Sequence, residues 1–437
     1  MRISVIGCGY LGAVHAACMA KLGHEVVGID LDERKIRELS AGRAPFFEPE
    51  LEELLLDVQG TGRLKFSSDI SEASDASVHF ICVGTPQKKG ENAADLRFVD
   101  AAVNSLLPHI SAHDVVVGKS TVPVGTAARL AEVVTNHEPE AHLVWNPEFL
   151  REGHAVSDTL HPDRFVYGVA DGSEDHPAVA ILDSLYAVPL SEGTPRLVAD
   201  LPTAELVKTA ANSFLATKIS FINAMAELCE AAGADVTRLA DAIGLDDRIG
   251  RKFLQAGIGF GGGCLPKDIR AFMARAGELG ADQALTFLRE VDAINMRRRT
   301  RVVELTRELC GDGLLGKRIT VLGAAFKPES DDVRDSPALS IAAQLQLQGA
   351  VVTVTDPKAI DNAAKRFPEL QYDHDTESAL ANAHAVLLLT EWKEYRDLDP
   401  HYLRNIVSSP RVLDGRNVLD AAKWRAAGWH YRGLGRP

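Results

Sequence analysis

The pattern of apolar and polar positions divides the chain into three parts. In the first part, short β-branched runs alternate with stretches whose apolar residues recur at helical spacing. This alternation is typical of a parallel sheet that carries helices on both faces. The runs that we expect to form its strands are residues 2–6, 25–29, 78–83, 115–119, 142–145 and 164–168.

The pattern becomes helical after Pro202. Residues 203–232 contain no Gly or Pro, and their apolar positions follow a helical period. This stretch is longer than a typical helix, so we expect it to connect domains or to form a dimer interface. Further helices are expected as far as about Leu309.

A second strand–turn pattern begins at residues 316–323. Further strands of this part are expected at residues 350–355, 385–390 and 411–413. The two α/β parts are therefore candidates for copies of one topology. We predict an α/β protein with an N-terminal Rossmann domain (1–200), a central long-helix domain (201–309) and a C-terminal Rossmann-like domain (310–437).

The composition excludes several classes of protein. Hydrophobic and charged fractions of 46% and 25% are those of a soluble globular protein, and a net charge of −14 disfavours a nucleic-acid partner. No apolar run reaches the roughly 18 residues of a membrane span. Met1 leads directly into the first expected strand, which leaves no room for a signal peptide.

The cysteines and histidines form no convincing metal-binding set. The six cysteines form no CxxC pair, and among the fourteen histidines only His109 and His113 have the HxxxH spacing, with no cysteine near them. We therefore predict no metal site, and reduced thiols in a cytoplasmic protein. The cysteines are Cys8, Cys18, Cys82, Cys229, Cys264 and Cys310.

A glycine-rich turn follows the first expected strand and opens a helix. In the sequence GCGYLG, Gly7 allows the tight turn, Gly9 lets a pyrophosphate approach the backbone, and Gly12 lets the helix pack on the strand. Asp30 ends the second expected strand, where a carboxylate binds ribose hydroxyls and repels a 2′-phosphate. The pattern predicts NAD rather than NADP. The alternative is a glycine-rich turn without a ligand, and Lys35 is either a ribose contact or a solvated helix residue.

Two further segments carry candidate chemistry. Lys208 and Asn212 lie four residues apart on the expected long helix, so they share one face and together suit alcohol oxidation; most such pairs are simply solvated. A glycine-rich run ends at Cys264, and the nearby Lys267 favours a thiolate, with Asp268 next to it. Cys264 is thus a candidate nucleophile, against the alternative of a small buried apolar residue.

The ends of two expected strands carry polar residues. Thr121 follows one strand, and the segment with Glu148, Arg151 and Glu152 follows the next. Ligands of Rossmann-type sheets bind at these strand ends. Any one of these charged groups could instead be a surface charge.

Taken together, these segments resemble the UDP-glucose/GDP-mannose dehydrogenase family over essentially the whole chain. A spaced lysine and asparagine also occur in single-step relatives such as 6-phosphogluconate dehydrogenases, which lack the cysteine loop, so Cys264 implies a four-electron oxidation. The motifs that carry the resemblance are GCGYLG (7–12), FICVGTP (80–86), STVPVGT (120–126), NPEFLREG (146–153), Lys208 with Asn212, GFGGGCLPKD (259–268), GAAFKP (323–328) and DDVRDSP (331–337).

Within the family, four segments resemble the branch that oxidises UDP-glucose: NSFLATKISFIN (212–223), RIGRKFLQAG (248–257), TEW (390–392) and DGRN (414–417). Leu265 is common in enzymes that oxidise GDP-mannose, which remains the alternative substrate. Gly263 is often Ser in the family. A different alternative is a non-catalytic NAD-sensing or scaffold protein on a dehydrogenase fold.

The resemblance implies a role for each site residue. NAD is expected on Gly7, Gly9, Tyr10, Leu11, Gly12, Asp30, Lys35, Thr85, Pro86, Thr121, Glu152, Lys267 and Arg334. The sugar and diphosphate are expected on Glu148, Phe149, Leu150, Arg151, Glu152, Lys208, Asn212, Gln255, Ala256, Gly257, Ile258, Gly259, Phe260, Gly261, Phe326, Lys327 and Arg416. Arg248 is expected to reach the substrate of a neighbouring subunit in a homodimer or larger homo-oligomer.

The implied mechanism oxidises a CH2OH group to a carboxylate. Lys208 and Asp268 manage the hydroxyl proton, Lys208 and Asn212 stabilise the oxyanion, and Cys264 captures the aldehyde as a thiohemiacetal and then a thioester. Glu148, with Thr121, activates the water that hydrolyses the thioester. The resemblance places UDP on the C-terminal domain and the active site in the cleft between the two end domains.

Overall fold

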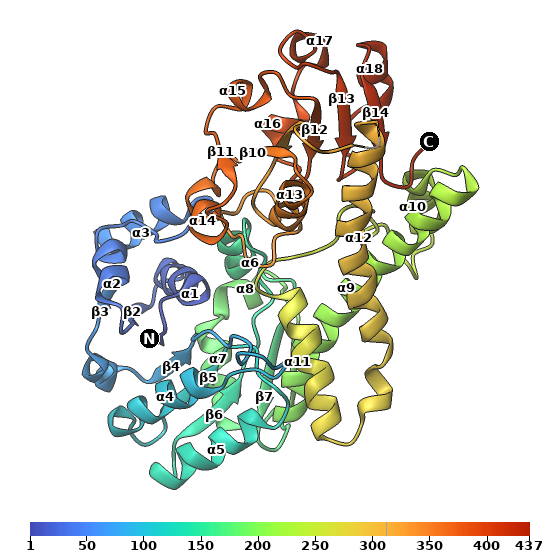
Figure 1. Cartoon of the computed structure of the whole chain (residues 1–437). Helices are drawn as coiled ribbons and strands as arrows, with labels where there is room; N and C mark the ends of the chain where they lie inside the picture. Colours follow the sequence, from blue (N-terminus) through green and yellow to red (C-terminus); the bar gives the residue numbers. More distant parts are fainter. Residues whose placement is uncertain (312) are drawn as a thin grey trace. The chain divides into compact units, whose positions relative to one another are not determined.

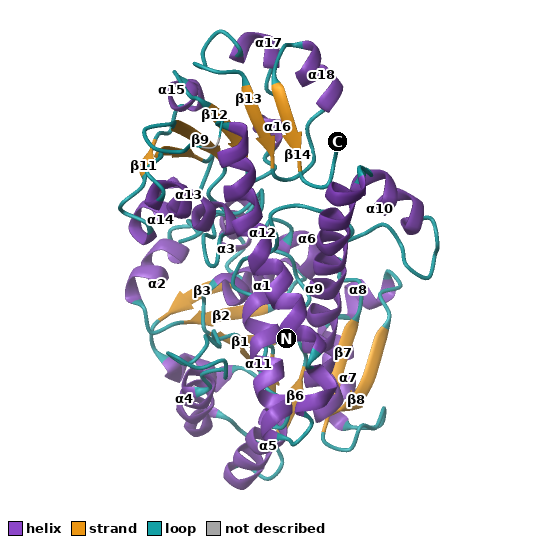
Figure 2. Cartoon of the chain, turned by 45° about the vertical axis from the view of Figure 1, so that its right-hand side comes forward, coloured by secondary structure: helices purple, strands orange, loops and turns teal. Residues whose placement is uncertain are grey.

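The computed structural model describes residues 1–311 and 313–437 (Figure 1). The chain forms two compact units. The first contains residues 1–211 and 270–280, and the second contains residues 212–269 and 281–437. Each unit is built around one sheet flanked by helices (Figure 2), which confirms the predicted α/β class. The division into three domains remains a prediction.

The sheet of the first unit has eight strands in the order β3-β2-β1-β4-β5-β6-β7-β8. The first six follow the Rossmann order 3-2-1-4-5-6. The strands are β1 (Arg2–Ile6), β2 (Glu25–Ile29), β3 (Leu64–Ser67), β4 (Val78–Ile81), β5 (Val115–Gly118), β6 (His142–Trp145), β7 (Phe165–Val169) and β8 (Arg196–Asp200).

One junction departs from the predicted parallel sheet. β6 and β7 pair antiparallel, at Trp145 and Gly168, whereas the other neighbouring strands are parallel. The connection between β6 and β7 carries only the short helix α6 (Ala155–Leu160). To run parallel to β6, strand β7 would need a connection that crosses from the end of β6 to the opposite end of the sheet. Here β7 instead starts near the end of β6 and runs in the opposite direction.

Helices cover both faces of this sheet. One apolar layer lies between the sheet and α1, α3, α6 and α7, and the other between the sheet and α4 and α5. Besides α6, the helices before α9 are α1 (Tyr10–Lys21), α2 (Glu33–Ser40), α3 (Leu51–Gly60), η1 (Ile70–Asp75), α4 (Arg97–Leu106), η2 (Leu107–His109), α5 (Thr126–His137), α7 (Pro177–Leu185) and α8 (Ala187–Ser191).

The sheet of the second unit repeats the Rossmann strand order. Its order is β11-β10-β9-β12-β13-β14, and every neighbouring pair is parallel. The expected repetition of one topology is therefore confirmed. The strands are β9 (Arg318–Leu322), β10 (Val351–Thr355), β11 (Gln371–Tyr372), β12 (Ala385–Leu388), β13 (Arg411–Asp414) and β14 (His430–Gly433).

The predicted long helix is α9 (Leu201–Ala232), which contains the boundary between the two units. It begins two residues before the predicted start, because Pro202 occupies the first turn, where a missing N–H costs little. Asp200 caps this end by accepting the N–H of Thr203 at 2.7 Å.

Among the other helices of the second unit, α11 and α12 are the longest. α11 runs on into the first unit at residues 270–280. These helices are α10 (Val236–Gly244), α11 (Leu265–Glu278), η3 (Asp282–Leu285), α12 (Phe287–Leu309), α13 (Pro337–Leu347), α14 (Ile360–Arg366), α15 (Thr376–Leu380), α16 (Lys393–Arg396), α17 (Pro400–Leu403) and α18 (Ala421–Ala426). Among the described residues, no helix combines the length and apolar character that a membrane crossing requires.

Candidate active site

The turn between β1 and α1 needs its three glycines for three different reasons. Gly7 has a φ of +91°, and a Cβ there would lie 2.7 Å from the Val83 side chain. A Cβ on Gly12 would lie 1.8 Å from the carbonyl oxygen of Gly7. A Cβ on Gly9 would meet nothing within 4 Å, so this position is open to a ligand at the start of α1. The turn thus fits a dinucleotide whose pyrophosphate lies at the helix N-terminus.

Asp30 closes the same turn from the end of β2. Its Oδ2 accepts the N–H of Cys8 at 2.9 Å, and its Oδ1 accepts the N–H of Asp32 at 2.9 Å. The ammonium of Lys35 lies 3.2 Å from the carboxylate. Asp30 and Lys35, the two residues predicted to contact the adenosine ribose, therefore form an ion pair with each other.

A buried carboxylate that the sequence analysis missed links this turn to the segment after β6. Glu48 accepts the Tyr10 hydroxyl and the N–H groups of Gly153 and Ala155, the latter two at 2.6 and 2.7 Å. Burial, together with this carboxylate, raises the pKa of Tyr10 far above its usual value. Tyr10 and Glu152, predicted from separate motifs, thus lie beside one network.

The strand ends after β4 and β5 are also joined. The Thr85 hydroxyl donates to the carbonyl oxygen of Thr121 at 2.7 Å, and the Ser120 hydroxyl donates to that of Val83 at 2.7 Å. These bonds place Thr85 and Thr121, both predicted to contact NAD, side by side beyond the carboxyl ends of β4 and β5. Pro86 follows Thr85 and is exposed.

Glu148 is held by its own loop and by a buried lysine. Its Oε1 accepts the N–H groups of Phe149 and Leu150 at 2.6 and 2.7 Å, and its Oε2 lies 3.4 Å from the Lys119 ammonium. Lys119 also donates to Asn146 at 3.1 Å. Oε1 of Glu148 is thus bound by the backbone of its own loop, and Oε2 faces the Lys119 ammonium.

Two more predicted residues of this segment differ in their surroundings. The ammonium of Lys208 lies 5.5 Å from the centre of the Phe149 ring, so Lys208 and Phe149 are neighbours in the first unit. Arg151 instead forms a forked pair with Asp158, at 2.6 and 2.9 Å, on the exposed side. In this structure, the guanidinium of Arg151 is thus occupied by Asp158.

Cys264 immediately precedes α11, and its carbonyl accepts the N–H of Asp268 at 2.9 Å within the first turn. Of the six cysteines, all within the described residues, only Cys264 is exposed. Burial raises the pKa of the Cys82 thiol to about 12, which keeps that thiol protonated. The N-terminus of α11 favours a thiolate at Cys264, which makes it the cysteine suited to be a nucleophile.

Asp268 is the centre of a buried group in the second unit. Its Oδ2 accepts the Asn212 amide at 2.7 Å, and its Oδ1 lies 2.8 Å from the Lys267 ammonium. Asn212 and Asp268 are both buried. Four predicted site residues, Asn212, Cys264, Lys267 and Asp268, therefore lie together.

The glycine run before Cys264 packs closely against another segment. A Cβ on Gly261 would lie 2.3 Å from the Asp335 carbonyl, one on Gly262 2.8 Å from the Phe326 ring, and one on Gly263 2.3 Å from the Arg334 guanidinium. One reason for such a run is that glycines let a ligand approach the backbone closely. The structure adds a second reason, because the segment 326–335 already fills the space of the missing side chains.

Further predicted substrate contacts fall into two groups. Arg416 donates to the carbonyl oxygens of Leu389, Gly259 and Phe326 at 2.8, 3.2 and 3.1 Å, so in this structure it braces backbone. Lys327 lies over the Phe326 ring at 5.5 Å. By contrast, Arg248 and Gln255 are exposed, and Arg248 pairs with Asp246 at 2.6 Å.

The described residues hold no group of three His, Cys, Asp or Glu side chains that could bind a metal ion.

Three models of the domains of one protein family match the chain in order. They are the NAD binding domain of the UDP-glucose/GDP-mannose dehydrogenase family at residues 1–188, its central domain at 202–297 and its UDP binding domain at 320–421. The chain belongs to the UDP-glucose/GDP-mannose dehydrogenase family.

Individual members of this family match over the full length. A UDP-glucose 6-dehydrogenase of Rhizobium meliloti is 42% identical over 440 residues, which cover 100% of both chains. The solved UDP-glucose dehydrogenase of Pyrobaculum islandicum is 39% identical, with a TM-score of 0.90, and the match covers 100% of this chain and 98% of that one. A solved GDP-mannose dehydrogenase of Pseudomonas aeruginosa is 28% identical, with a TM-score of 0.54, over 99% and 100%.

Membership of the family confirms three predictions made from the sequence. The fold class is confirmed, NAD is the cofactor of the first domain, and the enzyme is a sugar-nucleotide oxidoreductase. The alternative of a scaffold without catalysis has no support from these matches. The roles of the individual residues stay predictions.

Proposed function

We propose that this enzyme oxidises UDP-glucose to UDP-glucuronate in two NAD-dependent steps through a covalent intermediate on Cys264. The observation that carries the proposal is the exposed Cys264 at the start of α11, close to the buried Asn212 and Asp268 and to Lys267. A single oxidation needs no thiol at this place. The names of the relatives support UDP-glucose as the substrate.

In the first step, the C6 hydroxyl of the sugar loses its proton and the C6 carbon loses a hydride, which leaves an aldehyde. Bound NAD+ supplies the hydride acceptor for each of the two oxidations. Lys208 and Asp268, through a water, take the hydroxyl proton. The amide of Asn212, oriented by its hydrogen bond to Asp268, joins Lys208 in stabilising the developing oxyanion.

In the second step, the Cys264 thiolate adds to the aldehyde carbon. The new C–S bond gives a tetrahedral carbon that carries hydrogen, which a free aldehyde lacks, and loss of the second hydride leaves a thioester. Covalent capture also prevents the aldehyde from escaping.

Hydrolysis completes the reaction and regenerates the thiol. Oε2 of Glu148 takes a proton from water, and the hydroxide attacks the thioester and displaces the Cys264 sulfur. The Lys119 ammonium lies 3.4 Å from this oxygen, and Thr121 helps to hold the water.

Substrate choice is the direct test of this proposal. Purified enzyme is given NAD+ with either UDP-glucose or GDP-mannose, and NADH formation is measured side by side. We expect two NADH per UDP-glucose and little turnover of GDP-mannose. Faster turnover of GDP-mannose would replace the proposed substrate by the alternative.

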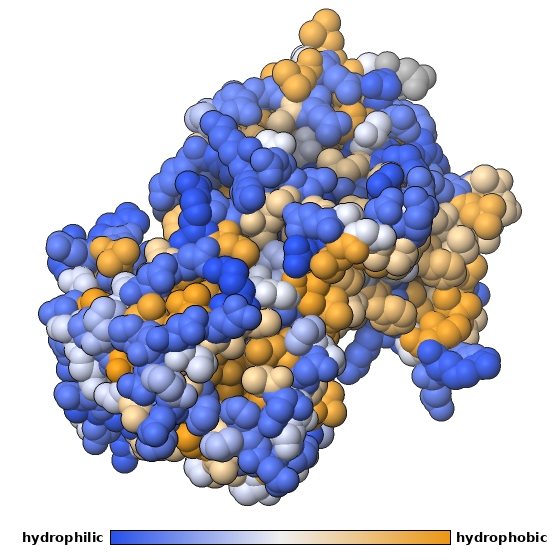
Figure 3. All heavy atoms as spheres, turned by 90° about the horizontal axis from the view of Figure 1, so that it is seen from below, coloured by the Kyte–Doolittle hydropathy of each residue, from blue (hydrophilic) through white to orange (hydrophobic). Residues whose placement is uncertain are grey.

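We also propose a homodimer formed through α9. Phe214, Phe221 and Leu228 are exposed and spaced by seven residues, so they lie along one side of this helix. Apolar side chains also gather in patches on the face seen in Figure 3. Arg248 is exposed and would act across the interface. Light scattering that finds an active monomer would refute this assembly.

A further inference from the structure

Buried side chains bind the backbone of residues 257–260 on several sides. We call these residues the glycine loop. The N–H of Gly257 donates to Asn223 Oδ1 at 2.8 Å, and its carbonyl accepts from Arg298 Nε at 3.2 Å. Gly257 is therefore held on one side by α9 and on the other by α12.

Asn295 of α12 binds the other end of the loop with both ends of its amide. Its Oδ1 accepts the N–H of Phe260 at 2.8 Å, and its Nδ2 donates to the carbonyl oxygen of Phe260 at 3.0 Å. Asn295 is fully buried. A Cβ on Gly259 would lie 2.4 Å from the Asn295 oxygen, so the glycine at position 259 leaves room for this amide.

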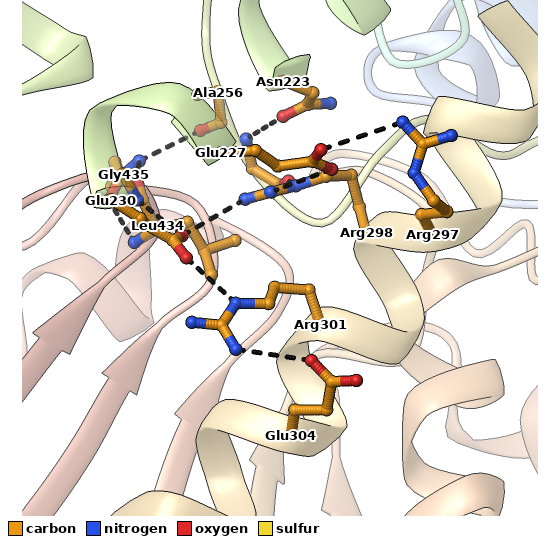
Figure 4. A network of polar contacts seen from close by, with 12 residues as sticks. Asn223, Glu227, Glu230, Ala256, Arg297, Arg298, Arg301, Glu304, Leu434 and Gly435 are labelled. Atoms are coloured by element: carbon orange, nitrogen blue, oxygen red, sulfur yellow. Dashed lines mark hydrogen bonds and ion pairs between the residues drawn. The ribbon is translucent and has the colours of Figure 1, made fainter. Parts of the chain in front are cut away.

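Arg298 lies one turn further along α12 and is completely buried. Its terminal nitrogens have no hydrogen-bond partner, and the carboxylates of Glu227 and Glu230 lie 3.6 and 3.9 Å away (Figure 4). Burial lowers the pKa of this guanidinium. A charge buried with such loose pairing costs stability. Its one close hydrogen bond goes to the glycine loop.

The end of the chain supports the same group. Glu230 accepts the N–H of Gly435 at 3.0 Å, and Asn417 donates both to Ala256, directly before the loop, at 3.2 Å and to Leu434 at 2.8 Å. Glu230 also pairs with Arg301 at 2.9 Å (Figure 4). Arg301 thus joins the network through a glutamate rather than through the loop itself.

We propose that Asn295 and Arg298 are positioning residues that set the backbone of the glycine loop for binding of the nucleotide sugar. This inference rests on the proposed function, in which the loop contacts the substrate. Asn295 fixes the peptide groups of Phe260, and Arg298 fixes the carbonyl of Gly257. Neither residue touches the reacting atoms.

The test compares three variants on α12. Asn295→Ala removes both hydrogen bonds to Phe260, and Arg298→Lys keeps the charge but not the bond from Nε. The matched control is Arg307→Lys on the same helix, whose partner Gln348 lies outside this network. We expect KM for UDP-glucose to rise about tenfold in the first two variants, from the loss of one or two hydrogen bonds. KM for NAD+ should stay within about twofold, because the NAD turn belongs to the first unit, and the control should match the wild type. A purely structural role would lower thermal stability or active fraction without separating the two KM values.

Hydrogen exchange decides the proposal if a variant folds poorly. In the wild type without substrate, the amides of Gly257 and Phe260 should exchange slowly, because Asn223 and Asn295 bind them. Fast exchange there, or an unchanged KM for UDP-glucose in a folded Asn295→Ala, would overturn the proposal. A wild type inactive with UDP-glucose would overturn only the proposed substrate, and the exchange of the loop amides in Asn295→Ala would still decide the positioning role.

Discussion

The second sheet repeats the order of the first six strands of the first sheet, but the two units differ in the chain that follows the turn after their first strand. In the first unit this turn begins at Gly7, and in the second at Gly323, which has a φ of +113°. At both positions a Cβ would collide with the second residue after the fourth strand of the unit, 2.7 Å from Val83 and 2.3 Å from Thr390. In both, an aspartate at the end of the second strand binds the N–H groups of the turn.

The two units diverge in the chain directly after this turn. In the first unit, α1 begins at Tyr10, and Asp30 is only partly buried. In the second, α13 begins only at Pro337, and the buried Asp356 accepts the N–H groups of Ala324 and Ala325 at 2.7 and 3.0 Å. Asp356 also accepts the Trp392 indole at 3.1 Å. The topology alone therefore does not make a dinucleotide site; the helix must follow the turn directly, and the aspartate must remain accessible.

The largest effect should come from the cysteine of the second unit. If the first sheet alone binds the dinucleotide, Cys264→Ala should lower UDP-glucuronate production by at least about a thousandfold while NAD+ binding stays unchanged. With the 6-aldehyde of UDP-glucose and NADH, this variant should still reduce the aldehyde. Product analysis and NAD+ titration measure the two properties separately.

Cys264→Ser serves as the companion of that variant. Its hydroxyl should form an ester that hydrolyses slowly, so intact-mass spectrometry should find a trapped substrate adduct. Two NADH per substrate at the wild-type rate from Cys264→Ala would show that hydration of the aldehyde suffices, and Cys264 would not be the nucleophile.

The aspartates of the two turns should differ in their effect on stability. In Asp356→Asn, an amide NH2 can replace the carboxylate oxygen that accepts the N–H groups of Ala324 and Trp392 in a buried site. We therefore expect a loss of about 4 kcal/mol in unfolding free energy. Asp30→Asn should cost only about 1 kcal/mol, because that site is partly solvated. Urea unfolding with both variants measures this contrast, and equal losses would contradict it.

The position of a strand in its sheet separates the strands that the sequence pattern predicted from those that it missed. Every interior strand of both sheets was predicted, because both of its faces are covered and most of its residues are apolar. The four missed strands are β3, β8, β11 and β14, which are the edges of the two sheets. β8 has no buried residue and only three apolar residues between Arg196 and Asp200, and β11 has only two residues, so both give a weak signal.

A buried carboxylate of the first unit should give a measurable pH dependence. Glu205 accepts the N–H groups of Gly125 and Ala127 at 2.7 Å each, and burial raises its pKa to about 7. Between pH 4.5 and 7 the folded protein thus holds a proton that the unfolded chain has released. Stability from this group therefore falls as pH rises through that window, by up to about 3 kcal/mol, and is constant above it.

Glu205→Gln should flatten this part of the profile of Tm against pH. Glu132→Gln, an exposed position on α5, is the control and should leave the slope unchanged. Asp414 in the second unit is also buried with a raised pKa, so some slope should persist. An identical profile for Glu205→Gln and the wild type would show that Glu205 does not hold the extra proton.

The candidate site could be predicted only where residues form motifs. Gly7, Asp30 and Cys264 lie in short segments whose spacing has a physical meaning, and the structure places each beside its expected neighbours. Glu48 and Asn295 are single polar residues within ordinary sequence, and their partners are 105 and 35 residues away. No local pattern reveals such a pair, because only the folded backbone brings an isolated side chain to the peptide group that it binds.

The smallest effect should be a change in cofactor preference at Asp30. A 2′-phosphate there would meet the charge of Asp30, whereas the carboxylate of Asp32 is occupied with the N–H groups of Arg34 and Lys35. Asp30→Ala removes a ribose acceptor and releases Lys35 from its ion pair. We expect kcat/KM for NAD+ to fall about tenfold and that for NADP+ to rise, so that the ratio narrows.

The control for this variant is Asp57→Ala, which breaks an exposed ion pair with Lys21 on the same unit and should leave the ratio unchanged. Asp356 gives the sharper contrast, because its carboxylate is enclosed by backbone N–H groups and an indole. Any folded Asp356 variant should keep the wild-type preference for NAD+. If wild-type turnover were equal with both cofactors, the charge at Asp30 would have no discriminating role, and accessibility of the aspartate would no longer separate the two turns.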